Sequence, residues 1–82
     1  MKVYGYEISR KAIDEAIEDM KMFKRFKAKD VERTLIICGV TGDGGIAYRA
    51  ADRIIQQQRK AGNIIYSSEN RSWQWIGGGK DA

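Results

Sequence analysis

The chain has 82 residues and carries 15 basic against 11 acidic side chains, for a net charge of +4 at pH 7. A chain of this length folds as one small domain with a modest core. It has no histidine and a single cysteine, Cys38, which excludes zinc sites built from cysteine and histidine and nucleophilic sites that require an imidazole. We therefore expect a protein that is not an enzyme, with no metal and no cofactor.

No apolar run approaches the roughly 20 residues that span a bilayer. The first residues, MKVYGYEIS, lack the apolar core of a signal peptide. Cytoplasmic localisation without a membrane partner is the resulting expectation. Cys38 lies in the apolar run LIICGV, so we interpret it as a buried thiol that acts as a small hydrophobic residue.

The first helix is predicted from Arg10 to about Phe26, after residues 1–7, which form either a short strand or an extended arm. Ser9 is a suitable N-cap, and Ile8 and Ile13 have the spacing of a hydrophobic staple. The apolar stripe of this helix consists of Ala12, Ile13, Ala16, Ile17, Met20 and Phe23.

Charge is polarised along this helix, with acidic residues in its first half and basic residues at its end. The basic group contains Lys21, Lys24, Arg25, Lys27 and Lys29. We favour complementarity to the helix dipole together with i,i+4 pairing. The alternative is a patch that faces phosphates.

The second helix is predicted from Ala28 to Cys38, with Val31, Leu35 and Cys38 along one face, widened by Ile36 and Ile37. Gly39 ends it. The following segment, VTGDGG over residues 40–45, is predicted to be a flexible connection. It lacks the Gly-Lys-Ser/Thr ending of a phosphate-binding loop and the repeated carboxylates of a calcium loop.

The third helix is predicted from about Ile46 to Ala61, and Gly62 ends it. Its inward stripe contains Ala47, Ala50, Ala51, Ile54, Ile55 and Gln58. Its outward face carries Tyr48, Arg49, Asp52, Arg53, Gln56, Gln57, Arg59 and Lys60.

A β-hairpin follows, with its turn centred on Glu69 and Asn70. This turn places Tyr66 opposite Trp73 and Ile64 opposite Trp75, so that all four side chains share one face of the ribbon. We expect this face to join the core, and we expect Asn70 to accept a positive φ. The alternative, in which the tryptophans stack on unpaired bases, is less favoured. Residues 77–82 are predicted to be a flexible tail.

The segments FKAKDVERTLIICGV and YRAADRIIQQQRKAGNIIYSSENRSWQWI resemble the lead-in helix, recognition helix and wing of the winged helix-turn-helix superfamily. The resemblance covers residues 9–76, within a single domain over residues 1–76. It implies an α+β fold of three helices with a C-terminal β-hairpin wing. Its pattern is degenerate, so it indicates a fold and no specific member. The glycine-rich turn is longer than the tight turn of the family.

The resemblance implies a small bacterial or phage DNA-binding regulator or DNA-transaction accessory, with the third helix in the major groove of double-stranded DNA. Arg49 and Arg53 would then read bases, and the other contacts would position the protein on the backbone. The full set of implied DNA-binding residues is Tyr48, Arg49, Arg53, Gln56, Gln57, Arg59, Lys60, Asn70 and Arg71. A homodimer or a partner protein would add specificity.

An alternative function remains open, because fold alone does not fix function. The same scaffold could serve as a protein–protein interaction module that does not bind DNA. A net charge of only +4 is compatible with both functions.

Overall fold

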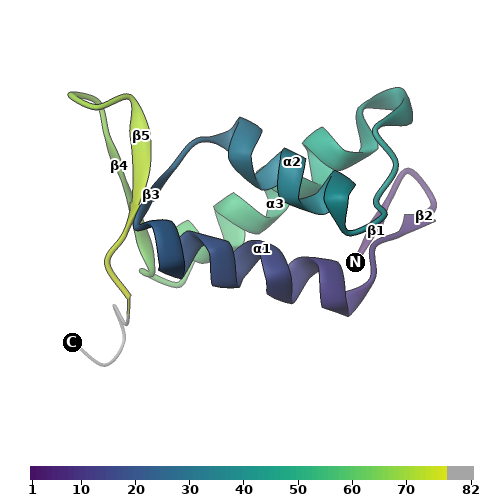
Figure 1. Ribbon diagram of the computed structural model, residues 1–82, viewed down its shortest axis with the longest axis horizontal. Coiled ribbons are helices and arrows are strands. Elements are labelled where there is room, and N and C mark those ends of the chain that lie inside the picture. The colour runs from purple at the N-terminus through teal and green to yellow at the C-terminus, as the bar shows by residue number, and fades with distance from the viewer. Residues whose placement is uncertain (78–82) are drawn as a thin grey trace.

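The computed structural model describes residues 1–77, so the tail predicted over 77–82 lies outside the described residues apart from Gly77. The fold is α+β, with three helices and small antiparallel sheets (Figure 1). In chain order the elements are β1 (Lys2–Val3), β2 (Tyr6–Glu7), α1 (Arg10–Phe23), β3 (Arg25–Phe26), α2 (Ala28–Ile37), the 3-10 turn η1 (Asp43–Gly45), α3 (Ile46–Lys60), β4 (Ile64–Ser67) and β5 (Ser72–Trp75).

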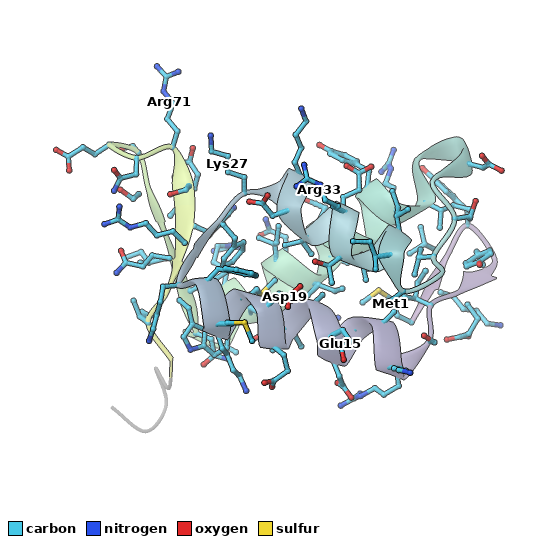
Figure 2. The ribbon with its side chains drawn as sticks, in the orientation of Figure 1. Met1, Glu15, Asp19, Lys27, Arg33 and Arg71 are labelled. Atoms are coloured by element: carbon cyan, nitrogen blue, oxygen red, sulfur yellow. The ribbon has the colours of Figure 1, made fainter. Side chains whose placement is uncertain are left out.

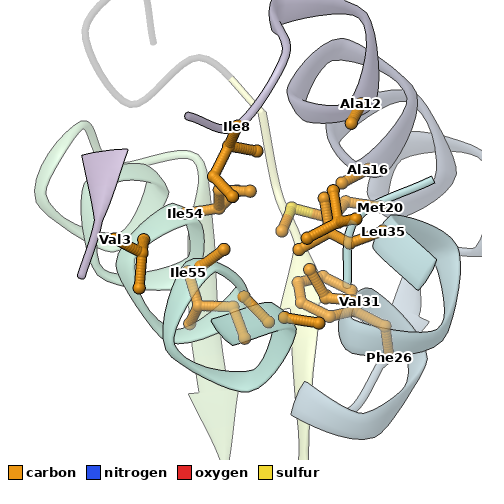
Figure 3. Close-up of a cluster of buried hydrophobic side chains, with 14 of the residues drawn as sticks. Val3, Ile8, Ala12, Ala16, Met20, Phe26, Val31, Leu35, Ile54 and Ile55 are labelled. Atoms are coloured by element: carbon orange, nitrogen blue, oxygen red, sulfur yellow. The ribbon is translucent and has the colours of Figure 1, made fainter. Parts of the chain in front are cut away.

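The core lies between the three helices, where aliphatic side chains converge (Figure 3). Five of the six residues predicted for the inward stripe of α3 are buried, namely Ala47, Ala50, Ala51, Ile54 and Ile55. The three alanines have no exposed surface, and their small side chains allow the close approach of α2 to α3. The burial of these residues fixes the opposite face of α3 as the face that solvent or a ligand can reach.

Helix α1 begins as predicted, because the Oγ of Ser9 accepts a hydrogen bond from the main-chain N–H of Ala12 at 3.2 Å. The prediction that it continues to Phe26 is wrong. The chain leaves the helix at Lys24, whose φ is 66°, and the next two residues form strand β3. Phe23 is therefore 65% exposed, whereas Phe26 is only 5% exposed.

The larger sheet has the strand order β3-β5-β4 and is antiparallel throughout. The predicted hairpin register is confirmed, with Tyr66 paired to Trp73 and Ile64 paired to Trp75. The rings of Tyr66 and Trp73 meet edge to face, with centroids 5.2 Å apart. Ile64 is buried and both tryptophans pack against the core, but Tyr66 is half exposed, so only part of the aromatic face joins the core.

The turn of this hairpin differs from the prediction in one residue. Arg71, and not Asn70, has the positive φ, at 51°. The Oγ of Ser67 accepts hydrogen bonds from the main-chain N–H and the side-chain amide of Asn70, both at 3.3 Å. The left-handed residue is thus the last of the four that join the strands, and the Arg71 side chain extends away from the ribbon (Figure 2).

Helix α2 ends one residue before the predicted boundary, and its apolar face is narrower than predicted. Val31 and Leu35 are buried, but Ile36 and Ile37 are exposed. Cys38 is only half buried, although it packs against the core. The burial predicted for these last three residues is therefore incomplete, because α2 contacts α1 and α3 along one side and leaves its opposite side open.

The glycine-rich segment between α2 and α3 contains the 3-10 turn η1. The main-chain carbonyl of Thr41 accepts a hydrogen bond from the N–H of Ala47 at 3.1 Å. The side-chain hydroxyl of Thr41 accepts another from the N–H of Asp43, also at 3.1 Å. Gly44 and Gly45 both have positive φ. Glycine is therefore required where the chain turns into α3.

Residues 1–7 form a second small hairpin, which lies at the opposite end of the molecule from the β4–β5 hairpin (Figure 1). Val3 anchors it in the core. The N-terminal ammonium group of Met1 donates a hydrogen bond to the carboxylate of Glu7 at 2.9 Å. That hydrogen bond lowers the pKa of Glu7 below its ordinary value.

Candidate nucleic-acid interface

The candidate interface is centred on the outward face of α3. The opposite side of this helix packs against α2. With about 3.6 residues per turn, Tyr48, Asp52 and Arg59 form one flank of this face, and Arg49 and Arg53 lie on the other. All five side chains are exposed. The sequence therefore predicts the accessible face of α3 correctly, except that Gln56, also expected on this face, is half buried.

The two arginines expected to read bases lie against the N-terminal hairpin. The Nη1 of Arg53 donates a hydrogen bond to the main-chain carbonyl of Lys2 at 2.7 Å. The guanidinium carbon of Arg49 lies 5.4 Å from the centroid of the Tyr4 ring, at cation–π distance. The hairpin thus holds both guanidinium groups at the N-terminal half of α3.

The C-terminal half of α3 carries the remaining helical candidates. Arg59 donates from its Nε to the Oε1 of Gln56 at 2.9 Å, which holds these two side chains together. Gln57 and Lys60 are exposed. Gln58, which was predicted to lie in the inward stripe, is half buried, and its Oε1 accepts a hydrogen bond from the Nδ2 of Asn63 at 2.8 Å, at the corner between α3 and β4.

Arg71 lies at the tip of the β4–β5 hairpin. Two basic residues at and after the start of α2 lie on the same edge of the molecule, although they are far from Arg71 in the sequence. Figure 2 shows Lys27, Arg33 and Arg71 in the upper half of the view, and Glu15 and Asp19 of α1 in the lower half. We call Lys27, Arg33 and Arg71 the basic edge. Strand β3 creates it, because β3 pairs with β5 and brings the start of α2 beside the hairpin.

Sequence reasoning missed the basic edge as a unit. Lys27 belongs to the basic group after the first predicted helix, for which the sequence favours pairing along the helix over a phosphate-facing role. Arg33 has no such pattern around it. The signal was the cluster of positive charge over residues 21–33. The position of this cluster near Arg71 depends on the β3–β5 pairing.

Ion pairs are unevenly distributed over residues 1–77. The three that form, Met1–Glu7, Arg10–Asp14 and Lys21–Glu18, lie in the N-terminal hairpin and α1. Within residues 1–77, the basic residues of α2, α3 and the tip of the β4–β5 hairpin form no ion pair. Their charges therefore remain available to an anionic partner.

Within residues 1–77, no three histidine, cysteine, aspartate or glutamate side chains come close enough together to hold a metal ion. None of the helices in that range is long and apolar enough to cross a membrane. Comparison of the chain with protein-family models, curated proteins and solved structures finds no match.

Proposed function

We propose that this chain is a winged helix-turn-helix protein that binds double-stranded DNA, with α3 in the major groove and the β4–β5 hairpin as a wing on the backbone. A role as a small bacterial or phage regulator, or as a DNA-transaction accessory, fits this activity. Dimerisation or a partner protein would raise the specificity that one domain can reach.

The β3–β5 pairing is the observation that carries the proposal. Phe26 of β3 pairs with Trp73, and the main-chain N–H of Trp75 donates to the carbonyl of Lys24 at 2.7 Å. These contacts fix the hairpin to the corner between α1 and α2. They bring the tip of the hairpin to the edge of the molecule that carries Lys27 and Arg33 (Figure 2), so that one anionic ligand could touch the start of α2 and the wing together.

The dimensions of α3 suit a major groove. Its 15 residues give a length of about 22 Å, and the groove, about 12 Å wide, admits a helix. The exposed face of α3 carries four basic residues, Arg49, Arg53, Arg59 and Lys60, against Asp52. Arginine, lysine and glutamine are donors to phosphates and to base edges.

The test is the salt dependence of binding to a random-sequence duplex, followed by fluorescence anisotropy. We expect the affinity to fall steeply with salt and the slope of log K against log salt to become shallower by about one in Lys27→Ala and in Arg71→Ala. Lys11→Ala is the charge-matched control, because Lys11 is exposed on the outward side of α1. Lack of binding by the wild-type protein at low salt would refute the proposal.

A second candidate function is protein–protein interaction, supported by a groove between α1 and α2. The groove has a volume of about 490 Å³, an apolar floor that includes Met20 and Val31, and the exposed side chains of Phe23 and Ile37 on its rim. Ile37 is 77% exposed. A groove of this kind accepts the apolar face of an amphipathic helix.

The groove is lined by two carboxylates and two guanidinium groups, so both signs of charge border its apolar floor. Asp30 accepts a hydrogen bond from the main-chain N–H of Lys27 and Asp19 accepts one from Thr34, both at 2.8 Å. Arg25 and Arg33 also line the groove, and among residues 1–77 they form no ion pair. If Ile37→Ser abolished binding of an amphipathic helical peptide and had no effect on duplex binding, the groove would be a separate site.

A further inference from the structure

A small cleft lies between the N-terminal hairpin and α3. It has a volume of about 160 Å³ and is lined by Val3, Tyr4, Arg49, Asp52 and Arg53. A water molecule occupies about 30 Å³ in the liquid, so the cleft can admit a polar group several times larger. The side chains of two arginines and one tyrosine border it.

The contacts in this cleft determine where the two guanidinium groups can act. A guanidinium has five N–H donors, so Arg53 retains donors after one bond to the carbonyl of Lys2. Arg49 interacts with the face of the Tyr4 ring, which leaves its N–H groups free. Tyr4 is 69% exposed, so a ligand can reach its side chain next to Arg49.

From this geometry we infer that the cleft between the β1–β2 hairpin and α3 binds one backbone phosphate of the DNA, held by Arg49, Arg53 and Tyr4. This inference rests on the proposed DNA binding, and it reassigns the two arginines from base reading to positioning. A base-reading arginine reaches a guanine through two parallel hydrogen bonds to O6 and N7. Both guanidinium groups are instead turned to the hairpin, where a phosphate oxygen can accept from them.

Asp52 lines the same cleft, and its negative charge opposes the binding of a phosphate there. The two arginines and the aspartate give the cleft a net charge of +1, from two positive groups and one negative group. Removing the negative charge should therefore strengthen the binding of any phosphate held there. Asp52 forms no ion pair within residues 1–77, which makes its substitution by asparagine a mild one for the fold.

The experiment measures the affinities of the wild-type protein, Arg53→Ala and Asp52→Asn for two duplexes of equal length, one rich in G·C pairs and one rich in A·T pairs, between 50 and 200 mM salt. A phosphate contact predicts that Arg53→Ala weakens binding to both duplexes by the same factor. It also predicts that the ratio of wild-type to variant affinity shrinks about 3.5-fold over this salt range, since one phosphate contact corresponds to about 0.9 released counterions. Asp52→Asn should strengthen binding to both duplexes equally, and Lys11→Ala should change neither.

The outcomes separate this inference from the proposed function. If the wild-type protein binds and Arg53→Ala affects one duplex far more than the other at an unchanged salt slope, Arg53 reads bases and the inference is wrong. If Arg53→Ala fails to fold by circular dichroism, Asp52→Asn decides. Equal strengthening on both duplexes supports the phosphate, and an unchanged or duplex-dependent affinity overturns it. If the wild-type protein binds neither duplex at low salt, the proposed function fails and the phosphate site fails with it.

Discussion

Two phenylalanines three positions apart provide a matched test of how the first helix ends. Phe26 is 5% exposed and Phe23 is 65% exposed. Truncating a buried phenylalanine to alanine costs about 3–5 kcal/mol of the free energy of unfolding. Burying a whole phenylalanine side chain contributes about 1.5–3 kcal/mol, so Phe23→Ala, which removes about a third of that burial, should cost about 0.5–1 kcal/mol.

The assay is urea unfolding followed by the fluorescence of the two tryptophans. Trp73 is the cross-strand partner of Phe26, so the probe lies beside the perturbed site. A domain of 82 residues has a total stability of about 4–12 kcal/mol at typical per-residue values, and Phe26→Ala could leave it largely unfolded. Phe26→Leu is then the usable variant, with an expected cost of about 1 kcal/mol.

The result that would refute this reasoning is a reversed order of costs. A helix that continued to Phe26 would place Phe23 in its apolar stripe, and Phe23→Ala would then be the more damaging substitution. Equal costs for the two alanine variants would show that β3 does not anchor the hairpin.

Three further predictions concern elements around the core. Thr34→Val and Asp19→Asn should each lower the free energy of unfolding by about 1–2 kcal/mol. The reason is the hydrogen bond of 2.8 Å from the Thr34 hydroxyl to the Asp19 carboxylate, which links α2 to α1. A double-mutant cycle on this pair should give a coupling energy of about 1 kcal/mol. Gly45→Ala should destabilise the protein by about 1 kcal/mol, because residue 45 has a φ of 75°. Gly42→Ala should be neutral or stabilise by up to about 1 kcal/mol, because residue 42 has a φ of −88° and an added Cβ would lie at ordinary contact distance. Thermal melts of the two variants test this contrast. The pKa of Glu7 is lowered in the folded chain. The ionised Glu7 carboxylate therefore stabilises the fold above the ordinary carboxyl pKa of about 4.3, and this contribution is lost as the pH falls through the lower pKa of the folded state. Glu7→Gln should thus reduce the fall in melting temperature at acidic pH.

Local patterns were sufficient to predict most of the fold. The N-cap at Ser9, the alanine-rich stripe of α3 and the pairing of Tyr66 with Trp73 each depend on residues close together in the sequence, where helical or strand periodicity applies. The end of α1 was not predictable in this way. Lys24 takes a left-handed conformation that its residue type does not favour, and the two-residue strand β3 exists because β5 offers it a free edge.

The candidate site likewise has one part that local sequence patterns predict and another that depends on tertiary contacts. Periodicity identified the outward face of α3, but it could not show that the hairpin around Tyr4 contacts Arg49 and Arg53, since these residues are separated by more than 40 positions in the sequence. The basic edge of Lys27, Arg33 and Arg71 also required the tertiary pairing of β3 with β5. Long-range contacts of this kind have no signature in the local pattern of charge and hydropathy.

The most direct test of DNA binding by α3 and the wing is an NMR titration of the isotope-labelled 9.3 kDa protein with a short duplex. DNA binding predicts amide shift changes along α3, at the start of α2 around Lys27 and at the wing tip around Arg71, with residues such as Glu15 on the outward side of α1 unchanged. Shift changes confined to the groove around Phe23 and Ile37, or no changes at low salt, would contradict the account.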